Sequence, residues 1–223
     1  MSNTSIDAAF HSANDRECYI FVKDKYVVVN YAPGGQKKDI IVAPKKIADG
    51  FPMFKNTIFA NGIDCAFDTK ENQTFIFSGN QCAKTDRPPY STNARLILGP
   101  IPINAMFPCL IGTVFENGID ATMRSTNDLN SRAFIFKGDN WGDLDIYSNY
   151  LYYNMKISAA IPKFYGTVFE SGVDAALNLH GNNEVYLFKG KYYAHYDFST
   201  QNFLNGLIKG IRNDWPALHG ILQ

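Results

Sequence analysis

The pattern of apolar and polar residues along this chain repeats four times, once in each quarter of its length. Each repeat begins with an aspartate that follows a β-branched residue, and successive aspartates are separated by 57, 56 and 54 residues. The four aspartates are Asp7, Asp64, Asp120 and Asp174. A fixed period of this length indicates an array of similar units, none of which buries its apolar face without its neighbours.

Alternating aromatic and aliphatic residues predict strands inside each repeat. An aromatic run follows each aspartate, at residues 19–22, 75–77, 134–136 and 186–188. Residues typical of tight turns come next, so the run and the segment after it predict a hairpin. A third strand follows, most clearly at residues 26–31 and 192–197. A less regular stretch comes after it, for which the pattern predicts no element.

A short apolar segment closes each repeat and is stopped by a proline. Residues 47–51, 103–107 and 211–215 suit one or two helical turns, because a proline biases the residue before it away from the helical region. The prolines are Pro52, Pro108, Pro162 and Pro216. Each of the first three lies 12 residues before the next aspartate, which indicates a fixed crossover between units.

The two ends of the chain complement one another. Internal repeats carry a Thr-x-Phe sequence after the proline, and the first repeat starts too late to include one. Ile221 lies five residues after Pro216, where the internal repeats have the threonine, and Leu222 follows it. The C-terminal segment can therefore supply what the first repeat lacks, so we expect it to lie beside the N-terminus. The sequence therefore predicts an all-β, four-bladed β-propeller with three or four antiparallel strands per blade and short helices at the blade ends. A two-sheet sandwich is the alternative, but it requires no constant spacing. We expect one domain, residues 1–223, with blades near 1–52, 53–108, 109–162 and 163–223.

Composition and charge agree with one compact body. The 223 residues are 46% hydrophobic, and 21 basic residues balance 21 acidic ones. The chain therefore has no net positive charge that would attract nucleic acid or an anionic membrane. We find no basic-plus-apolar leader and no run of about 20 apolar residues, so a cytosolic location is expected.

The sequence contains no recognisable catalytic or metal-binding motif. The four cysteines form no CxxC pair, so we expect reduced, mostly buried thiols. They are Cys18, Cys65, Cys82 and Cys109. No nucleophile elbow, zinc-protease motif, phosphate loop or dinucleotide fingerprint is present, and the histidines are dispersed. We therefore predict a protein that is not an enzyme.

The start of each repeat predicts an ion site. In a propeller the first strand of each blade lines the central axis with an unpaired edge, and main-chain groups two residues apart point the same way, about 6.6 Å apart. Four such strands present stacked rings. We expect one ring of main-chain carbonyls from Asp7, Asp64, Asp120 and Asp174, and a second of main-chain groups from Ala9, Ala66, Thr122 and Ala176. Carbonyl oxygens suit Ca²⁺ or Na⁺, and amides suit Cl⁻. Alternatively, the aspartates only satisfy backbone amides; both roles are compatible.

Several motifs together resemble a known family. They are the fourfold Ile/Val-Asp-Ala segment, the Phe-x-Phe-Lys-Gly-Asp hairpin at residues 134–139 and the Phe-Pro or Trp-Pro pairs. Over essentially the whole chain they resemble the hemopexin-like repeat. Details at residues 49–51, 113–121 and 211–213 are similar to the legume seed albumin-2 group. Animal hemopexin-like domains commonly join the first and last blades by a disulfide, but Cys18 has no counterpart in the fourth repeat.

The resemblance implies a cytosolic seed albumin that forms homodimers and binds spermine or heme. Candidate heme ligands are His11, His180, His195 and His219; candidate spermine-binding groups are Glu116, Glu170, and Asp139 with Trp141, Asp143 and Asp145. The sequence alone does not assign the contact residues of either ligand. Two alternatives remain open: a seed nitrogen store with incidental binding, and a protein-docking module.

Overall fold

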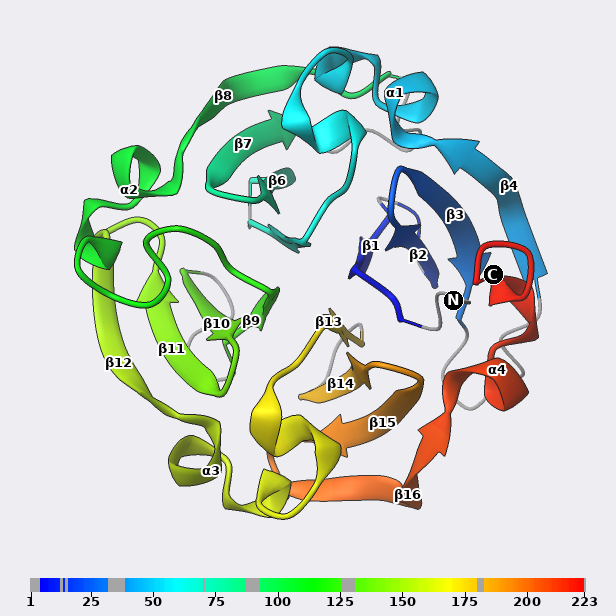
Figure 1. The fold of residues 1–223 in the computed structure, drawn as a ribbon, viewed down its shortest axis with the longest axis vertical. Helices are drawn as coiled ribbons and strands as arrows, with labels where there is room; N and C mark the ends of the chain where they lie inside the picture. Colours follow the sequence, from blue (N-terminus) through cyan, green and yellow to red (C-terminus); the bar gives the residue numbers. More distant parts are fainter. Residues whose placement is uncertain are drawn as a thin grey trace.

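The chain folds into a ring of four antiparallel sheets (Figure 1). The computed structural model describes residues 5–12, 14, 16–31, 39–69, 71–86, 93–125, 131–179 and 183–222. Within each sheet four strands pair in sequence order, with the first at the centre of the ring and the fourth at its rim. The predicted four-bladed β-propeller is confirmed.

The sixteen strands of the described residues divide equally among the blades. Blade 1 contains β1 (Ala8–His11), β2 (Glu17–Val22), β3 (Lys25–Asn30) and β4 (Asp39–Lys46). Blade 2 contains β5 (Cys65–Asp68), β6 (Gln73–Ser78), β7 (Gln81–Asp86) and β8 (Leu96–Pro102). Blade 3 contains β9 (Ala121–Arg124), β10 (Arg132–Lys137), β11 (Asn140–Asp145) and β12 (Tyr150–Lys156). Blade 4 contains β13 (Ala175–Asn178), β14 (Glu184–Lys189), β15 (Tyr192–Asp197) and β16 (Asn202–Gly210).

The fourth strand of each blade occupies the stretch for which the sequence predicted no element. These rim strands are largely exposed, as β8 and β12 illustrate. Each also shifts register against the third strand, which is the mark of a bulge. A bulge adds an unpaired residue and interrupts the two-residue alternation that identifies a strand in a sequence.

Short helices connect the blades along the rim. They are α1 (Ile47–Gly50), α2 (Ile103–Met106), α3 (Ile157–Ala160) and α4 (Ile211–Asp214). After one intervening residue, a 3₁₀ turn begins at the proline that follows each helix. These turns are η1 (Pro52–Phe54), η4 (Pro108–Leu110), η5 (Pro162–Phe164) and η7 (Pro216–Leu218). Further 3₁₀ turns are η2 (Ile58–Ala60) and η6 (Val168–Ser171). Each proline therefore opens the next turn as well as stopping the helix, since its missing N–H is not needed at a first helical position. No helix in the described segments is long and apolar enough to cross a membrane.

The apolar core is divided among the interfaces between blades. Four clusters of buried residues are present, and each draws on two neighbouring blades. Successive residues of an inner strand face opposite neighbours: Ala8 belongs to the core between blades 1 and 2, and Ala9 to the core between blades 4 and 1.

The chain ends close the ring, as the sequence predicted. Ile221 and Leu222 are buried in the same cluster as Ile6 and Tyr31 of the first blade. Figure 1 shows the two ends beside β3 and β4. Packing of the C-terminal segment between the fourth and first blades therefore completes the circle.

Candidate functional site

The four inner strands enclose the central axis with their backbones. Each of β1, β5, β9 and β13 is the edge of its sheet, hydrogen-bonded to one strand, and each lies against the inner strands of both neighbouring blades. Because their side chains point into the interblade cores, the unpaired backbone edges face the axis. An unpaired strand edge presents amide and carbonyl groups that need partners.

Each repeated aspartate lies just before its inner strand, outside the paired register. The amide of Asp7 donates to the carbonyl of Phe21 at 2.9 Å, although the register partner of Phe21 is Ala8. Asp64, Asp120 and Asp174 repeat this arrangement with Phe77, Phe136 and Phe188. The register pairs of each inner strand begin one residue after the aspartate, so the main-chain oxygen of the aspartate is not part of the paired register.

The aspartate side chains brace the neighbouring hairpins. Each carboxylate accepts a hydrogen bond from a backbone amide in the turn after the second strand. The donors are Lys23 at 2.5 Å, Gly79 at 2.6 Å, Gly138 at 2.8 Å and Gly190 at 2.7 Å. The aspartates therefore do satisfy backbone amides, the role that the sequence analysis kept as an alternative compatible with ion binding.

Charge is unevenly distributed around this ring. Lys137 pairs with Asp120 and Lys189 pairs with Asp174, both at 2.6 Å. The equivalent position is Val22 in blade 1 and Ser78 in blade 2. Blades 1 and 2 therefore lack a lysine at this position, and the only lysine charges that act on Asp7 and Asp64 among the described residues come from Lys23 and Lys137.

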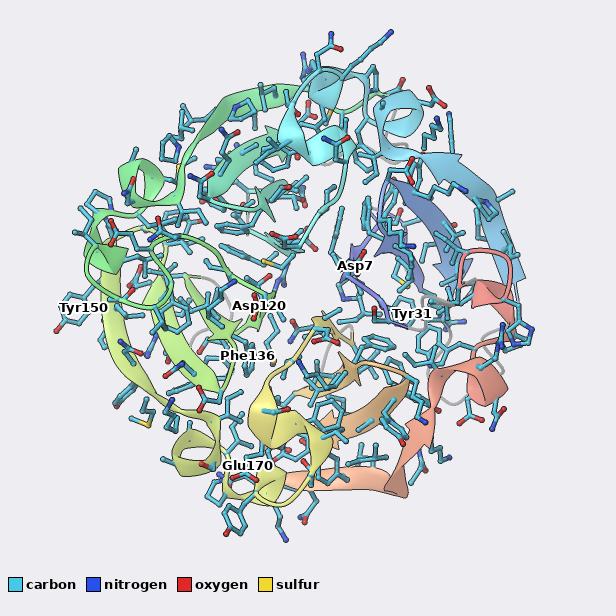
Figure 2. All side chains as sticks on the ribbon, in the orientation of Figure 1. Asp7, Tyr31, Asp120, Phe136, Tyr150 and Glu170 are labelled. Atoms are coloured by element: carbon cyan, nitrogen blue, oxygen red, sulfur yellow. The ribbon has the colours of Figure 1, made fainter. Side chains whose placement is uncertain are left out.

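The charges of these carboxylates act on one another. Burial raises the pKa of Asp7 above its ordinary value of 3.8, the Lys23 amide opposes this, and the charges of Asp64 and Asp174 raise it further. Burial likewise raises the pKa of Asp64, the Gly79 amide and the charge of Lys137 oppose this, and the charge of Asp120 adds to the rise. In Figure 2, Asp7 and Asp120 both lie toward the centre of the ring.

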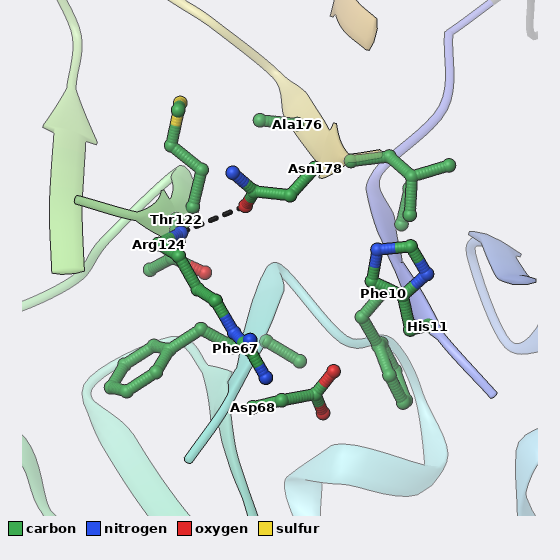
Figure 3. A pocket seen from close by; sticks show the side chains of 12 residues that line it. Phe10, His11, Phe67, Asp68, Thr122, Arg124, Ala176 and Asn178 are labelled. Carbon is green, nitrogen blue, oxygen red and sulfur yellow. Dashed lines mark hydrogen bonds between the residues drawn. The ribbon is translucent and has the colours of Figure 1, made fainter. Parts of the chain in front are cut away.

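A small cavity lies further along the axis (Figure 3). Its volume is about 20 Å³, enough for a water molecule or a monatomic ion. The predicted second ring lines it: Ala9, Ala66, Thr122 and Ala176. Thr122 is 2% exposed, and its hydroxyl meets the Cys65 thiol of the neighbouring blade. The backbones of the four inner strands therefore enclose the cavity, while the Thr122 hydroxyl belongs to the interface between blades 2 and 3.

Sequence reasoning missed a polar ring at the far end of the cavity. It consists of the fourth residue of each inner strand: His11, Asp68, Arg124 and Asn178. Each lies four positions after a repeated aspartate, a register that was readable from the sequence, but the four side chains differ in type and so form no visible motif.

Neighbouring groups hold this polar ring in place. The Tyr31 hydroxyl lies 2.8 Å from His11 Nδ1, and Asp68 accepts a hydrogen bond from the Thr74 hydroxyl at 2.9 Å. Asn178 accepts from the main-chain amide of Arg124 at 2.8 Å, which joins blades 3 and 4. Figure 3 shows the Arg124 side chain extending toward Asp68.

The candidate heme ligands do not converge. His11 lines the channel cavity, which is far too small for a porphyrin. His195 Nε2 lies 2.6 Å from Glu184, and His219 Nε2 lies 2.6 Å from the Arg212 carbonyl oxygen. His180 lies outside the described residues. The structure therefore singles out no histidine as a heme ligand.

The candidate spermine-binding carboxylates all have structural contacts. Glu116 accepts from the Gly112 amide at 2.9 Å, and Glu170 accepts from the Gly166 amide at 2.8 Å. Asp139 pairs with Lys156, and Asp145 accepts from the amides of the following turn.

The remaining members of that group are buried. The side chain of Asp143 is fully buried and forms an ion pair with Arg132, and Trp141 is 8% exposed. Asp143 is therefore not accessible to a polyamine. Partly exposed acidic turns remain at Glu116 and Glu170, and an exposed one remains at Asp139.

Side chains alone build no metal site in the described part of the chain: no group of three or more His, Cys, Asp or Glu residues is arranged to hold an ion. The cysteines lie apart from this chemistry, with Cys18, Cys65 and Cys82 buried and Cys109 half-buried.

Comparisons with known proteins place the chain in a family. The hemopexin family model matches residues 173–220. An albumin-2 of Pisum sativum is 42% identical over 224 residues, which cover 97% of this chain and 96% of the relative. A solved plant albumin of Cicer arietinum, described as showing hemagglutination, is 42% identical with a TM-score of 0.90 and covers 97% of this chain and 98% of its own. A second Cicer arietinum structure, described as a plant lectin with two metal-binding sites, is 43% identical with a TM-score of 0.90 and the same coverage. The chain therefore belongs to the albumin-2 family of hemopexin-fold seed albumins.

Proposed function

We propose that this seed albumin is a non-enzymatic ligand-binding protein whose central channel holds a hard cation. The observation that carries the proposal is the set of four unpaired strand edges around the axial cavity. Main-chain oxygens are ligands that Ca²⁺ and Na⁺ accept. The lectin of Cicer arietinum with two metal-binding sites supports a metal in this fold.

The ring of Asp7, Asp64, Asp120 and Asp174 would hold the cation through its main-chain carbonyls. Ca²⁺ takes 6–8 oxygen ligands, so waters would complete the shell around four carbonyls. The carboxylates of Asp7 and Asp64, which have no lysine at the equivalent position, add a negative potential that favours a cation over an anion there. A chloride would instead suit main-chain amides of the second ring.

Thermal unfolding of the full chain tests the cation. A ligand that binds only the folded state stabilises it by about 2.7 kcal/mol at one hundred times its Kd. We expect the Tm to rise on adding millimolar Ca²⁺ to chelator-treated protein, with Na⁺ and Mg²⁺ as comparison ions. Identical melting curves with chelator and with each ion would refute the channel proposal.

Family resemblance extends the proposal to reversible binding of spermine or heme by a cytosolic homodimer. The acidic turns at Glu116, Glu170 and Asp139 are the surfaces that a polycation would meet. Titration with spermine and with hemin, each followed by sedimentation, tests both ligand binding and assembly. Saturable micromolar binding supports the proposal, whereas a monomer that binds neither ligand points to nitrogen storage or protein docking.

Carbohydrate binding is a second candidate function, and the two related proteins from Cicer arietinum favour it. One is described as showing hemagglutination and the other as a lectin, and both match this chain over 97% of its length. Agglutination requires at least two binding sites on one particle, which a homodimer provides. Agglutination of red cells by the full chain, and its inhibition by free sugars, tests this function independently of the channel.

A further inference from the structure

Three exposed tyrosines gather on the rim of the third blade. Tyr150, Tyr152 and Tyr153 belong to β12, and their exposed fractions are 56%, 47% and 47%. We refer to these three residues as the tyrosine platform. Tyr147, in the turn before β12, instead donates its hydroxyl hydrogen bond to Glu71 of blade 2. Figure 2 shows Tyr150 at the outer edge of the ring, far from the aspartates of the channel.

A bulge brings the three rings to one face of the sheet. Tyr153 pairs with Asp143 and Leu151 pairs with Leu144, so Tyr152 is the extra residue between them. Tyr150, opposite Asp145, shares the face of Tyr153, and Tyr152 turns to that face as well, where it meets Arg132. Bulges often re-aim side chains beside binding sites.

The rings are held in fixed orientations. The guanidinium of Arg132 lies 4.0 Å from the centre of the Tyr152 ring, and the buried carboxylate of Asp143 anchors Arg132 from beneath. Tyr150 meets Tyr152 edge-to-face at 4.9 Å. Tyr153 stacks on Trp141 at 5.8 Å. Because their orientations are already fixed, these side chains would lose little conformational entropy on binding a ligand.

Chemistry distinguishes the platform from the rims of blades 1 and 2. There the exposed large residues of the outer strands are aliphatic: Ile40 and Ile41 on β4, and Leu96, Ile97 and Leu98 on β8. Tyrosine instead offers a flat apolar face with a hydroxyl at its edge. A pyranose ring has the complementary form, with one C–H face and a rim of hydroxyl groups.

The Arg132 cation beneath the platform opposes a polycationic ligand. Arg132 pairs with Asp143, and the second carboxylate beside the rings, Asp145, lies opposite both Tyr150 and Arg132 and accepts hydrogen bonds from turn amides. The Arg132 cation already covers one face of Tyr152, so a polyamine gains little there. We propose that the tyrosine platform binds neutral pyranose oligosaccharides through their C–H faces. This inference rests on the carbohydrate-binding function proposed above, for which it names the site.

Removal of two rings from the full chain tests the site. The probes are neutral sugars: glucose, galactose, mannose, N-acetylglucosamine and their short oligomers. Binding is followed by Trp141 fluorescence and by calorimetry, and agglutination by its titre. The double variant Tyr150→Ala/Tyr152→Ala should weaken sugar binding and the titre about tenfold or more, as expected for central aromatic contacts. Tyr150→Phe, which keeps the ring face, should bind nearly as wild type does.

Tyr165→Ala is the matched control, because Tyr165 is 73% exposed and lies outside the platform. It should bind and agglutinate as wild type does. Sugar binding that survives in the double variant would overturn the inference while leaving the carbohydrate function in place. A wild-type chain that binds no neutral sugar would overturn both, without affecting the channel. Loss of self-association alone in the double variant would assign the platform to contact between two copies and overturn the inference.

Discussion

At the residue scale, the repeated aspartate combines a structural and an electrostatic role. In blade 1 the carboxylate of Asp7 braces the adjacent hairpin, and its charge adds to those of Asp64 and Asp174 around the axis. In Asp7 and Asp64 burial raises the pKa, so the folded state favours the protonated form of both. The stability that this preference contributes is fully present below pH 3.8 and is lost as the pH rises through the folded pKa. At neutral pH, without a bound cation, these two charges therefore oppose folding.

Substitution of Asp7 separates the two roles. Asp7→Ala leaves the Lys23 amide without its acceptor, and we expect a loss of about 1 kcal/mol of unfolding free energy. Asp7→Asn keeps an acceptor oxygen and removes the charge, so its stability relative to wild type should improve as the pH rises from 3.8 to 7. Urea unfolding at several pH values in chelator measures this difference.

The exposed Asp49 supplies the control for that series, because Asp49→Asn removes a carboxylate from the rim helix α1 and not from the channel. In Ca²⁺ we expect Asp7→Asn to gain less stability than wild type, because it has lost a charge near the ion. Parallel pH profiles for wild type and Asp7→Asn would contradict the electrostatic account.

At the element scale, the blades solve the same packing problem with different residues. In blade 1 the end of α1 lies against the ring of Tyr26, and only a glycine fits: a Cβ on Gly50 would come within 2.0 Å of the Tyr26 hydroxyl. In blade 4, Asp214 holds the equivalent position and accepts a hydrogen bond from the Tyr193 hydroxyl at 2.5 Å. A steric fit in one blade therefore corresponds to a polar contact in another.

Gly50→Ala should consequently destabilise the protein. Tyr26 is 2% exposed and packs against Phe21 and Phe51, so its ring has little room to move. Overpacking of this kind costs about 1–3 kcal/mol. Asp49→Ala in the same helix, at an exposed position, should have almost no effect. Thermal unfolding of both variants checks the contrast, and equal Tm values would show that the helix shifts without strain.

How far the sequence predicted the structure depended on what each element contacts. Inner strands and hairpins were readable because the aspartate and the aromatic run recur in one register. Rim strands were not, because bulges and exposure remove their alternation. Asp143 looked like one of several acidic surface residues. Its burial depends on Arg132, which lies diagonally across the neighbouring strand, and only the strand register reveals such a pair.

The candidate site divides in the same way. The positions of the aspartates could be predicted from the repeat, and so could the small residues of the second ring. The polar ring of His11, Asp68, Arg124 and Asn178 did not, because its four members share a position but no chemistry. The tyrosine platform depends on a bulge between Asp143 and Leu144, which a sequence pattern does not contain.

At the scale of the whole molecule, stability is shared around the ring. Every core cluster lies between two blades, so no blade of the described structure has a core of its own. Loss of one interface exposes part of two blades at once. We therefore expect the four blades to unfold together in one cooperative transition, unlike an open array, in which terminal units fray independently.

The closing contact between the last and first blades gives the sharpest test of this cooperativity. Ile221 and Leu222 are 7% and 3% exposed, and truncation of a buried Ile or Leu to Ala costs about 2–5 kcal/mol. Ile221→Ala/Leu222→Ala should therefore lose at least about 3 kcal/mol, and its Tm should fall by roughly 6–12 °C or more. Ile111→Ala/Val114→Ala removes two apolar side chains that are 61% and 45% exposed and should change the Tm little. Because a closed ring links all blades, calorimetry of the closure variant should still show a single transition. A separate early transition confined to the terminal blades would instead mean that the ring opens without unfolding, and that its blades are energetically independent.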